Sequence, residues 1–314
     1  MKKIISIFLL SAILLTAFSG CYEKDKNDDS NGKISVVSTG FAAYDFTKQI
    51  AGDLADIKML LPPATESHSF EPTPQDIITI QNCDIFIYVG GESDEWVAGI
   101  LESIDNSKMK VITLIDCVAV LEEEIVEGMS TEEDHDDDVA VDEHIWTSPQ
   151  NAKLIVKKIT QTLCEVDPEH ETEYIRKESF YQSELDKLDK SFREVVDQAV
   201  RKVIIFGDRF PFRYLTDAYG LEYYAAFPGC STETEPSAST IAFLIDKIKE
   251  TDIPVVFFVE LSNQKIANTI CEETSAKPLL LHSCHNISKN DFEKGITYLE
   301  LMNDNILALK EALL

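Results

Sequence analysis

Residues 168–201 read PEHETEYIRKESFYQSELDKLDKSFREVVDQAVR, and after the opening proline this stretch contains neither Pro nor Gly. Its apolar residues recur near helical spacing: Tyr174, Phe180, Tyr181, Leu185, Leu188, Phe192, Val195, Val196 and Ala199. The stretch therefore predicts one long helix, about 50 Å if it is unbroken at a rise of 1.5 Å per residue. A rod of this length limits how far two flanking lobes can close on each other.

Short apolar runs that are typical of buried strands lie on both sides of this helix and alternate with helical segments. Before it, strands are expected at residues 34–39, 57–61, 84–89 and 110–114, with helices at 41–52, 74–83 and 92–104. After it, strands are expected at 202–206, 221–226, 254–259 and 279–281, with helices at 212–219, 237–250, 264–274 and 291–314. This alternation predicts an α/β fold in which each set forms a mainly parallel sheet flanked by helices.

These patterns predict two lobes joined by one long rigid helix. We place the N-terminal lobe at residues 33–166, the connecting helix at 167–201 and the C-terminal lobe at 202–314. The alternative is a single larger domain that contains the helix. Because strands resume immediately after the helix, we favour two lobes.

The composition excludes several classes of protein. The chain has 314 residues, with 56 acidic and 28 basic side chains and a formal net charge of −28. Such an acidic chain is a poor nucleic-acid binder, because phosphate backbones are bound through Lys and Arg. Hydrophobic residues make up 44% of the chain, which supports a large core, and seven Cys are too few for a disulfide scaffold. Pairing among Cys230, Cys271 and Cys284 stays open, because connectivity does not follow from sequence.

The N-terminus carries an export signal. Two lysines precede an apolar run at residues 4–18, and two small residues and Cys21 follow it. This pattern predicts a signal peptide over residues 1–20. The order small, small, Cys resembles a bacterial lipobox, in which Cys21 becomes the lipid-carrying first residue of the mature chain; ordinary secretion with cleavage nearby is the alternative. Because residues 21–32 are polar and charged, as in a flexible tether, we expect an extracytoplasmic protein that a lipid anchors to the cell membrane.

Three of the six histidines lie where an α/β fold places its ligands, at strand ends and helix starts. His68 follows a strand on a proline-rich loop, whose restricted backbone suits a pre-positioned metal ligand. His144 lies just ahead of a predicted helix, and His282 directly follows the strand-like run LLL. Three imidazoles favour zinc over calcium or magnesium, which prefer oxygen ligands.

Residues beside these histidines are expected to support them. Trp146 offers an apolar wall next to the second histidine, and Glu143 or Asp142 could accept the second N–H of that imidazole. Cys284 and His285 follow the third histidine closely and are expected around the ion rather than on it. A thiolate ligand from Cys284 is the weaker alternative.

Two of these stretches resemble a known family. Residues 62–77 (PPATESHSFEPTPQDI) are similar to the first metal-ligand loop of the zinc and manganese solute-binding proteins of bacterial ABC transporters. Residues 142–152 (DEHIWTSPQNA) are similar to the second ligand motif of that family, with Glu143 in place of the usual Pro. The segments FRYLTDAYGL, ETEPSAST and PVVFFVELSNQ recur in family order, so the resemblance covers the whole mature chain. It implies a receptor that carries an ion to a membrane permease and performs no catalysis.

The resemblance places the third and fourth ligands less clearly. An ungapped match puts Arg209 in the place of the third ligand, but a guanidinium cannot bind a cation. Asp208 takes that role if the loop shifts by one residue; alternatively, it caps the following helix or pairs with Arg209. The fourth ligand is an Asp in the family, or is lacking in some zinc members, and it corresponds here to His282. A His at this place favours zinc over manganese.

A long acidic segment precedes the second ligand motif. Residues 122–143 (EEEIVEGMSTEEDHDDDVAVDE) contain one His and no apolar period. They resemble a His-poor version of the loop that zinc-specific members carry at this place. Such a loop can concentrate cations near the site. Simple solvation or weak calcium binding is an equal alternative.

Together these features predict a lipid-anchored monomer that captures zinc between its lobes and delivers it to the permease of an ABC importer. The four ligand candidates are His68, His144, Asp208 and His282. A manganese or iron receptor, or an adhesin on the same fold, is the alternative within the family. A secreted zinc hydrolase is the alternative from another class, with Glu66, Glu71 or Glu143 as general base. The sequence contains none of the standard hydrolase motifs that would support it.

Overall fold

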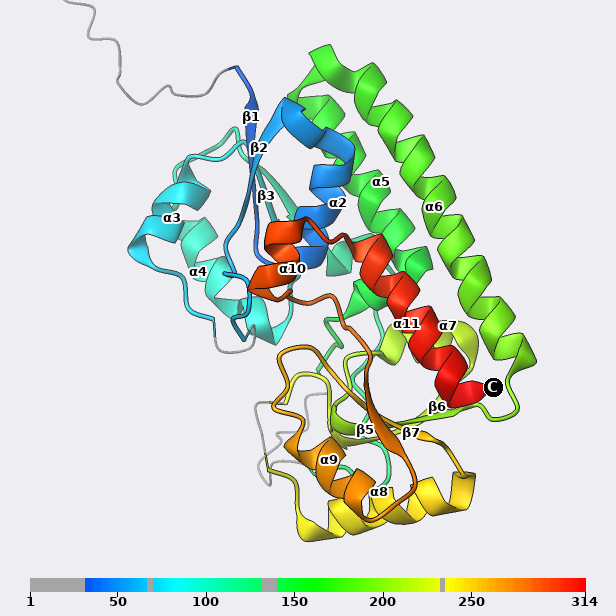
Figure 1. The fold of residues 1–314 in the computed structure, drawn as a ribbon. Helices are drawn as coiled ribbons and strands as arrows, with labels where there is room; N and C mark the ends of the chain where they lie inside the picture. Colours follow the sequence, from blue (N-terminus) through cyan, green and yellow to red (C-terminus); the bar gives the residue numbers. More distant parts are fainter. Residues whose placement is uncertain (1–31, 67–69, 131–139, 232–234) are drawn as a thin grey trace, which may run out of the picture. The chain divides into compact units, whose positions relative to one another are not determined.

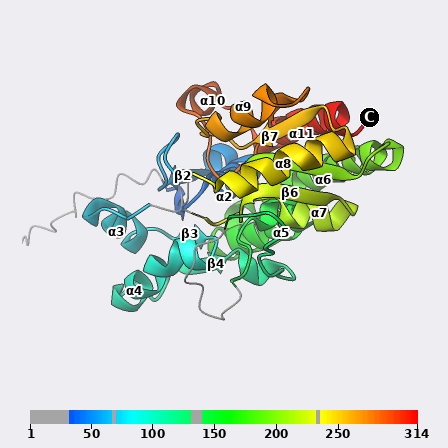
Figure 2. The same ribbon diagram turned by 90° about the horizontal axis from the view of Figure 1, so that it is seen from below.

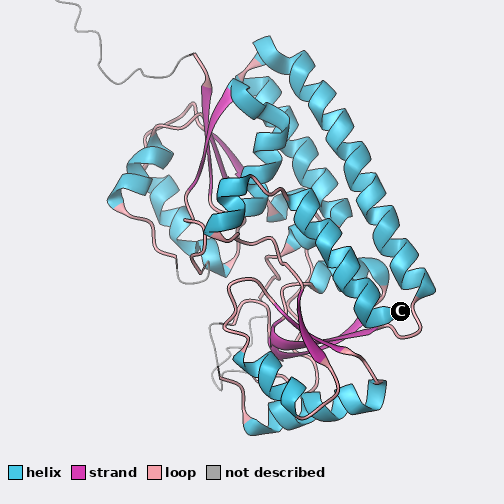
Figure 3. Ribbon diagram, in the orientation of Figure 1, coloured by secondary structure: helices cyan, strands magenta, loops and turns pink. Residues whose placement is uncertain are grey.

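Two four-stranded sheets dominate the computed structural model, which describes residues 32–66, 70–130, 140–231 and 235–314 (Figure 1). Within these ranges every strand pairing is parallel. Figure 3 shows helices lying along both sheets. The predicted α/β fold, with two parallel-sheet lobes and a long helix between them in the sequence, is therefore confirmed. The predicted signal peptide, Cys21, His68 and the middle of the acidic segment lie outside the described residues.

The first sheet has the strand order β2-β1-β3-β4, with β1 at Ile34–Ser38, β2 at Ala55–Met59, β3 at Ile85–Tyr88 and β4 at Lys110–Thr113. Its two faces are covered by α2 (Phe41–Ala51) with α5 (Pro149–Val166), and by α3 (Pro74–Gln81) with α4 (Glu95–Ser103). Neighbouring residues of β1 therefore enter different cores: Val36 packs on the α2 side and Val37 on the α4 side. Burial of both faces in the central strands β1 and β3 explains why these two read as continuous apolar runs.

The second sheet has the order β6-β5-β7-β8, with β5 at Val203–Arg209, β6 at Glu222–Phe227, β7 at Val255–Phe258 and β8 at Lys277–Leu280. The helices α8 (Ala238–Thr251) and α9 (Lys265–Glu272) pack against it, and α7 (Arg213–Tyr219) contacts the long helix. Parallel strands bring their carboxyl ends to one edge. That edge carries Asp208 and Arg209 on β5 and Glu260 just after β7.

The predicted long helix is α6, at Glu171–Gln198, and a 3₁₀ turn at Pro168–His170 precedes it. Its buried side is lined by most of the predicted apolar series: Tyr174, Tyr181, Leu185, Leu188, Phe192, Val195 and Val196. Phe180, from the same series, is 67% exposed, so it lies off that stripe. The helix packs against α5 along much of its length.

The C-terminal helix expected at residues 291–314 is two helices, α10 (Lys289–Lys294) and α11 (Tyr298–Leu313). Gly295 ends α10 in the left-handed region, with φ of +72°, which glycine adopts without steric cost. Thr297 and Glu300 then form a capping box that starts α11. Figures 1 and 2 both show α11 alongside α6. Because α11 also contacts α2, β5 and β8, it connects elements of both sheets.

The described ranges contain neither a membrane-spanning helix nor a disulfide. No helix there is both long enough and apolar enough to cross a bilayer. The six described cysteines are free thiols, so the pairing that the sequence left open between Cys271 and Cys284 is not formed.

Candidate metal centre

His144 is held by the acidic residue two positions before it. It lies at the N-terminus of the 3₁₀ turn Ile145–Thr147 and is 1% exposed. Asp142 Oδ1 accepts a hydrogen bond from the main-chain N–H of His144 at 2.8 Å and lies 3.1 Å from its ring Nδ1. Of the two carboxylates that the sequence offered, Asp142 therefore orients the imidazole. With Nδ1–H directed at Asp142, Nε2 is the ring atom suited to bind a metal.

Carboxylates set the charge state of this histidine. Burial alone lowers the pKa of His144, but the nearby carboxylates of Asp142, Glu143 and Glu123 outweigh it, and the net pKa is raised. Glu143 has a different role from that of Asp142, because its Oε1 accepts the N–H of Ser93 at 2.7 Å. Burial raises the pKa of Glu143 to about 7.

A second imidazole, that of His285, faces His144. Their ring centroids are 5.2 Å apart and the ring planes are nearly perpendicular, at 82°. Two imidazoles on one tetrahedral zinc, with Zn–N bonds of about 2.0–2.1 Å, have centroids roughly 5 Å apart. The indole of Trp146 lies 5.8 Å from the ring of His144 and 5.1 Å from that of His285. The predicted apolar wall thus contacts both histidines.

Long-range hydrogen bonds tie the two histidine-bearing segments together. The indole N–H of Trp146 donates to the carbonyl of Ser283 at 2.8 Å. The hydroxyl of Tyr298, at the start of α11, donates to the carbonyl of Trp146 at 2.7 Å. The carbonyl of His285 accepts the N–H of Phe41, at the start of α2, at 3.1 Å. These three hydrogen bonds, one between the two segments and one each to the starts of α11 and α2, fix the relative position of the two imidazoles.

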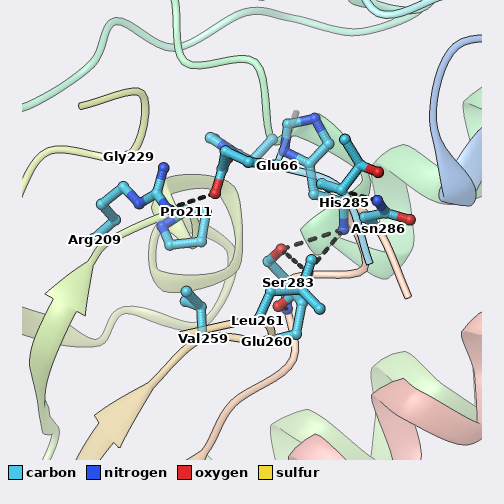
Figure 4. Close-up of a pocket in the computed structure, with 12 residues that line it drawn as sticks. Glu66, Arg209, Pro211, Gly229, Val259, Glu260, Leu261, Ser283, His285 and Asn286 are labelled. Atoms are coloured by element: carbon cyan, nitrogen blue, oxygen red, sulfur yellow. Dashed lines mark hydrogen bonds and ion pairs between the residues drawn. The ribbon is translucent and has the colours of Figure 1, made fainter. Parts of the chain in front are cut away.

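Beside the two rings lies a cavity of about 40 Å³. Its walls include His144, His285, Glu66, Arg209 and Glu260, and Figure 4 shows the last four around it. Since a water molecule needs roughly 10–15 Å³ of such space, the cavity has room for an ion and a small number of waters. The ring nitrogens and the carboxylates make it suited to a cation.

His282, the histidine that the resemblance placed on the ion, points elsewhere. It is 6% exposed, and its Nδ1 accepts the N–H of Cys284 at 3.0 Å. The side-chain amide of Asn305 bonds both main-chain groups of His282. It accepts the N–H at 2.7 Å and donates to the carbonyl at 2.8 Å. Its side chain does not line the described cavity, whereas that of His285 does.

Cys284 is an unsuitable ligand in this arrangement. It is fully buried, and burial, together with the carboxylates of Glu260 and Asp45, holds the pKa of its thiol well above the ordinary range. A thiol binds zinc as the thiolate, so this protonated side chain is better suited to the core.

Arg209 and Asp208 are used in ways that the sequence left open. Arg209 Nη2 lies 2.8 Å from Glu66 Oε2, and Nη1 donates to the carbonyl of Ser231 at 3.3 Å. Asp208 is 8% exposed and its carboxylate accepts the N–H of Arg209 at 2.8 Å and that of Val259 at 3.4 Å. Burial raises the pKa of Asp208. Both carboxylate oxygens of Asp208 thus face the main chain, and its side chain is absent from the walls of the described cavity.

The described ranges bring two candidate ligands together, His144 and His285, and not a third. Within them, no group of three His, Cys, Asp or Glu side chains is arranged to hold a metal ion. His68 lies outside these ranges, but Thr65 and Glu66, just before it in the sequence, line the cavity.

Parallel-sheet lobes, a long connecting helix and a small cavity with facing imidazoles define a two-lobed binding protein for a transition-metal ion. Residues 36–312 match the family described as zinc-uptake complex component A, periplasmic. The chain belongs to that family, which comprises solute-binding receptors.

Its relatives include proteins named for zinc. The chain is 34% identical over 323 residues to the high-affinity zinc uptake system protein ZnuA of Bacillus subtilis, covering all of this chain and 98% of that one. It is 32% identical to the zinc-binding lipoprotein AdcA of Streptococcus pneumoniae, covering 99% of this chain but 61% of the relative. The Zn(II)-bound crystal structure of the ZnuA-like domain of that AdcA superposes with a TM-score of 0.74 at 31% identity, covering 90% of this chain and 99% of the other.

Proposed function

We propose that this protein is the extracytoplasmic receptor of a zinc ABC importer, which captures the ion in the described cavity and hands it to the membrane permease. The observation that carries the proposal is the pair of facing imidazoles, His144 and His285, at a centroid separation of 5.2 Å. The family description and the zinc-binding relatives support zinc as the cargo.

The ligand set that we propose is His144, His285 and His68. Imidazole nitrogen suits zinc, whereas manganese and calcium sites are richer in oxygen. Three protein ligands leave one position of a tetrahedral ion for water or for a further side chain. This set differs from the one inferred from the resemblance, because His285 replaces His282 and Asp208 has no part.

The location and the anchor follow from the N-terminus and the family. We propose that Cys21 carries a lipid that holds the receptor at the cell membrane, as the name of the lipoprotein relative supports. The acidic segment at residues 122–143 would raise the local concentration of cations by its charge. Its described parts also have packing roles: Glu123 accepts the N–H of Cys230 at 2.9 Å, and Glu124 pairs with Arg213.

The test is zinc affinity of the chain from residue 33 onward, which contains the whole compact unit 34–314. Wild type should contain one zinc per chain, and His144→Ala and His285→Ala should each weaken binding strongly. His282→Ala should lose much less affinity than either variant, because its imidazole bonds the N–H of Cys284 in the loop and does not line the cavity. His170→Ala is the control, since that side chain pairs with Asp167 at the start of α6. Loss of binding in His282→Ala but not in His285→Ala would refute the proposed ligand set.

A further inference from the structure

One acidic side chain, that of Glu260, makes three hydrogen bonds to the loop that carries His285. Its Oε2 accepts the N–H of Ser283 at 2.8 Å. Its Oε1 accepts the hydroxyl of Ser283 at 2.5 Å and the N–H of His285 at 3.2 Å (Figure 4). The Glu260 side chain is 9% exposed, so these charge-assisted bonds are shielded from water.

The backbone of this loop needs such an anchor. Cys284 has φ of +59°, in the left-handed region that non-glycine residues rarely adopt. In this turn the N–H groups of Ser283 and His285 both point to the carboxylate of Glu260, as N–H groups point to the anion in a backbone nest. Glu260 receives the N–H groups of Ser283 and His285, and His282 Nδ1 receives that of Cys284. The carboxylate therefore accepts the N–H of Ser283 and shares that of His285 with the hydroxyl of Ser283, which lies 3.2 Å away.

Glu260 differs from the other acid on the cavity wall. Glu66 lies 2.8 Å from the guanidinium of Arg209, so its charge is largely compensated. The groups that donate hydrogen bonds to Glu260 in the loop are neutral main-chain and hydroxyl groups. The ring Nδ1 of His282 also lies 3.7 Å from Glu260 Oε2. A divalent ion among neutral imidazoles has two positive charges to balance, and a nearby carboxylate stabilises it.

We propose that Glu260 is a positioning residue of the metal site. Its carboxylate fixes the main chain on both sides of Cys284, and so sets the place and direction of the His285 imidazole, while its charge stabilises the cation. The inference rests on the proposed function. It requires that Glu260 act through His285, without binding the ion itself.

The test compares Glu260→Gln, Ser283→Ala and wild type for zinc affinity, for the absorption spectrum of bound Co²⁺ and for the melting temperature of the metal-free protein. Removing partners that orient a ligand commonly costs about 10–100-fold in metal affinity, and we expect a loss in this range for Glu260→Gln. Ser283→Ala should lose less, because it removes the two hydrogen bonds of the hydroxyl, to Glu260 and from the N–H of His285, but keeps the charge. In Glu260→Gln the Co²⁺ bands should shift, since one imidazole is displaced, while the metal-free melting temperature stays close to that of wild type. Glu250→Gln, which changes an exposed acid of α8, is the matched control.

Zinc affinity and a Co²⁺ spectrum equal to those of wild type in Glu260→Gln would overturn the inference and leave the proposed function intact. A wild-type protein without zinc would overturn both. If Glu260→Gln does not fold, Ser283→Ala decides: reduced affinity with an altered spectrum supports the inference, and unchanged values overturn it.

Discussion

Two effects on the imidazole of His144 oppose each other. Zinc requires the neutral ring, whereas the surrounding carboxylates, above all that of Asp142, raise its pKa and favour the imidazolium. A group with a raised folded-state pKa stabilises the metal-free fold below its unfolded-state pKa and loses this contribution as pH rises through the folded-state pKa. In the proposed site, protons and zinc therefore compete for the His144 ring.

We predict that zinc affinity falls as pH is lowered, and that the fall begins above the ordinary histidine pKa of about 6.5. Titrations of zinc affinity between about pH 5.5 and 8 would measure it. In Asp142→Asn the fall should move to lower pH, because the charge that raises the pKa is lost, while affinity at pH 8 drops roughly 10-fold because a neutral amide is a weaker acceptor for the Nδ1–H than a carboxylate. A pH-independent affinity would contradict the assignment of His144.

The sequence alone could not show which of His282 and His285 faces the cavity. Both follow a strand-like run within four residues, so position along the chain does not separate them. The structure separates them through a left-handed turn at Cys284, which directs His285 into the cavity and His282 to its own backbone. Glu260 was missed because it contacts only this turn, whose conformation is invisible in the sequence. By contrast, His144 with its carboxylate partner was predictable, because Asp142 lies two residues away.

Among the secondary-structure elements, those with strong periodic patterns were predicted best. The helix α6 is 28 residues long and repeats its apolar residues throughout, so its existence was clear from sequence. The central strands β3, β5 and β7 were also clear, because burial on both faces leaves apolar runs. The break between α10 and α11 was missed, since Gly295 alone marks it and isolated glycines are tolerated within helices.

Asp45 links two of these elements. Its Oδ2 accepts the N–H of Tyr298, the first residue of α11, at 3.0 Å, and its Oδ1 accepts the side-chain amide of Gln49 within α2 at 3.0 Å. It is 3% exposed, and burial raises its pKa to about 6. A carboxyl with a raised folded-state pKa is a penalty that is absent at low pH, grows between the unfolded- and folded-state pKa values and is complete above the latter.

We predict that Asp45→Asn stabilises the metal-free protein at pH 7 by about 1–3 kcal/mol, because the amide keeps the bond to α11 without the buried charge. At about pH 4 the advantage should disappear, since Asp45 is then protonated. Urea unfolding at the two pH values would measure both effects. Asp53→Asn, at an exposed position after α2, is the control. A variant less stable than wild type at pH 7 would show that the charge is needed for the α2–α11 contact.

At the scale of the whole molecule, Arg209 and Glu66 connect the two lobes across the cavity. Arg209 ends β5 in the second sheet, and Glu66 lies on the loop after β2 in the first. The pair is partly exposed, at 21% and 42%, so solvent screens it and we expect about 0.2–1 kcal/mol of coupling. Because Arg209 also repels the cation, a single substitution mixes two effects.

We therefore predict a coupling between Arg209→Gln and Glu66→Gln in the rate of zinc dissociation, of roughly 1.5- to 5-fold at low salt. The double-mutant cycle cancels the repulsion, and stopped-flow release into a chelator would provide the rates. The coupling should vanish near 1 M salt, where the screening length is about 3 Å. Additive effects at low salt would mean that the pair does not help to retain the ion.

Because the proposed ligands come from both lobes, bound zinc should stabilise the whole chain against unfolding. His144 precedes α5 in the first lobe, and His285 follows β8 in the second, so an ion bound by both must leave before these segments separate. A ligand that binds only the folded state adds about 2.7 kcal/mol when its concentration is 100 times its Kd. For a protein of this size that corresponds to a rise in melting temperature of roughly 5–10 °C. Calorimetry with zinc, with a chelator and with magnesium would measure the shift, which we expect for zinc alone. In His285→Ala the shift should be largely lost; if it persists there in full, the ion is held within one lobe, and zinc cannot link the two.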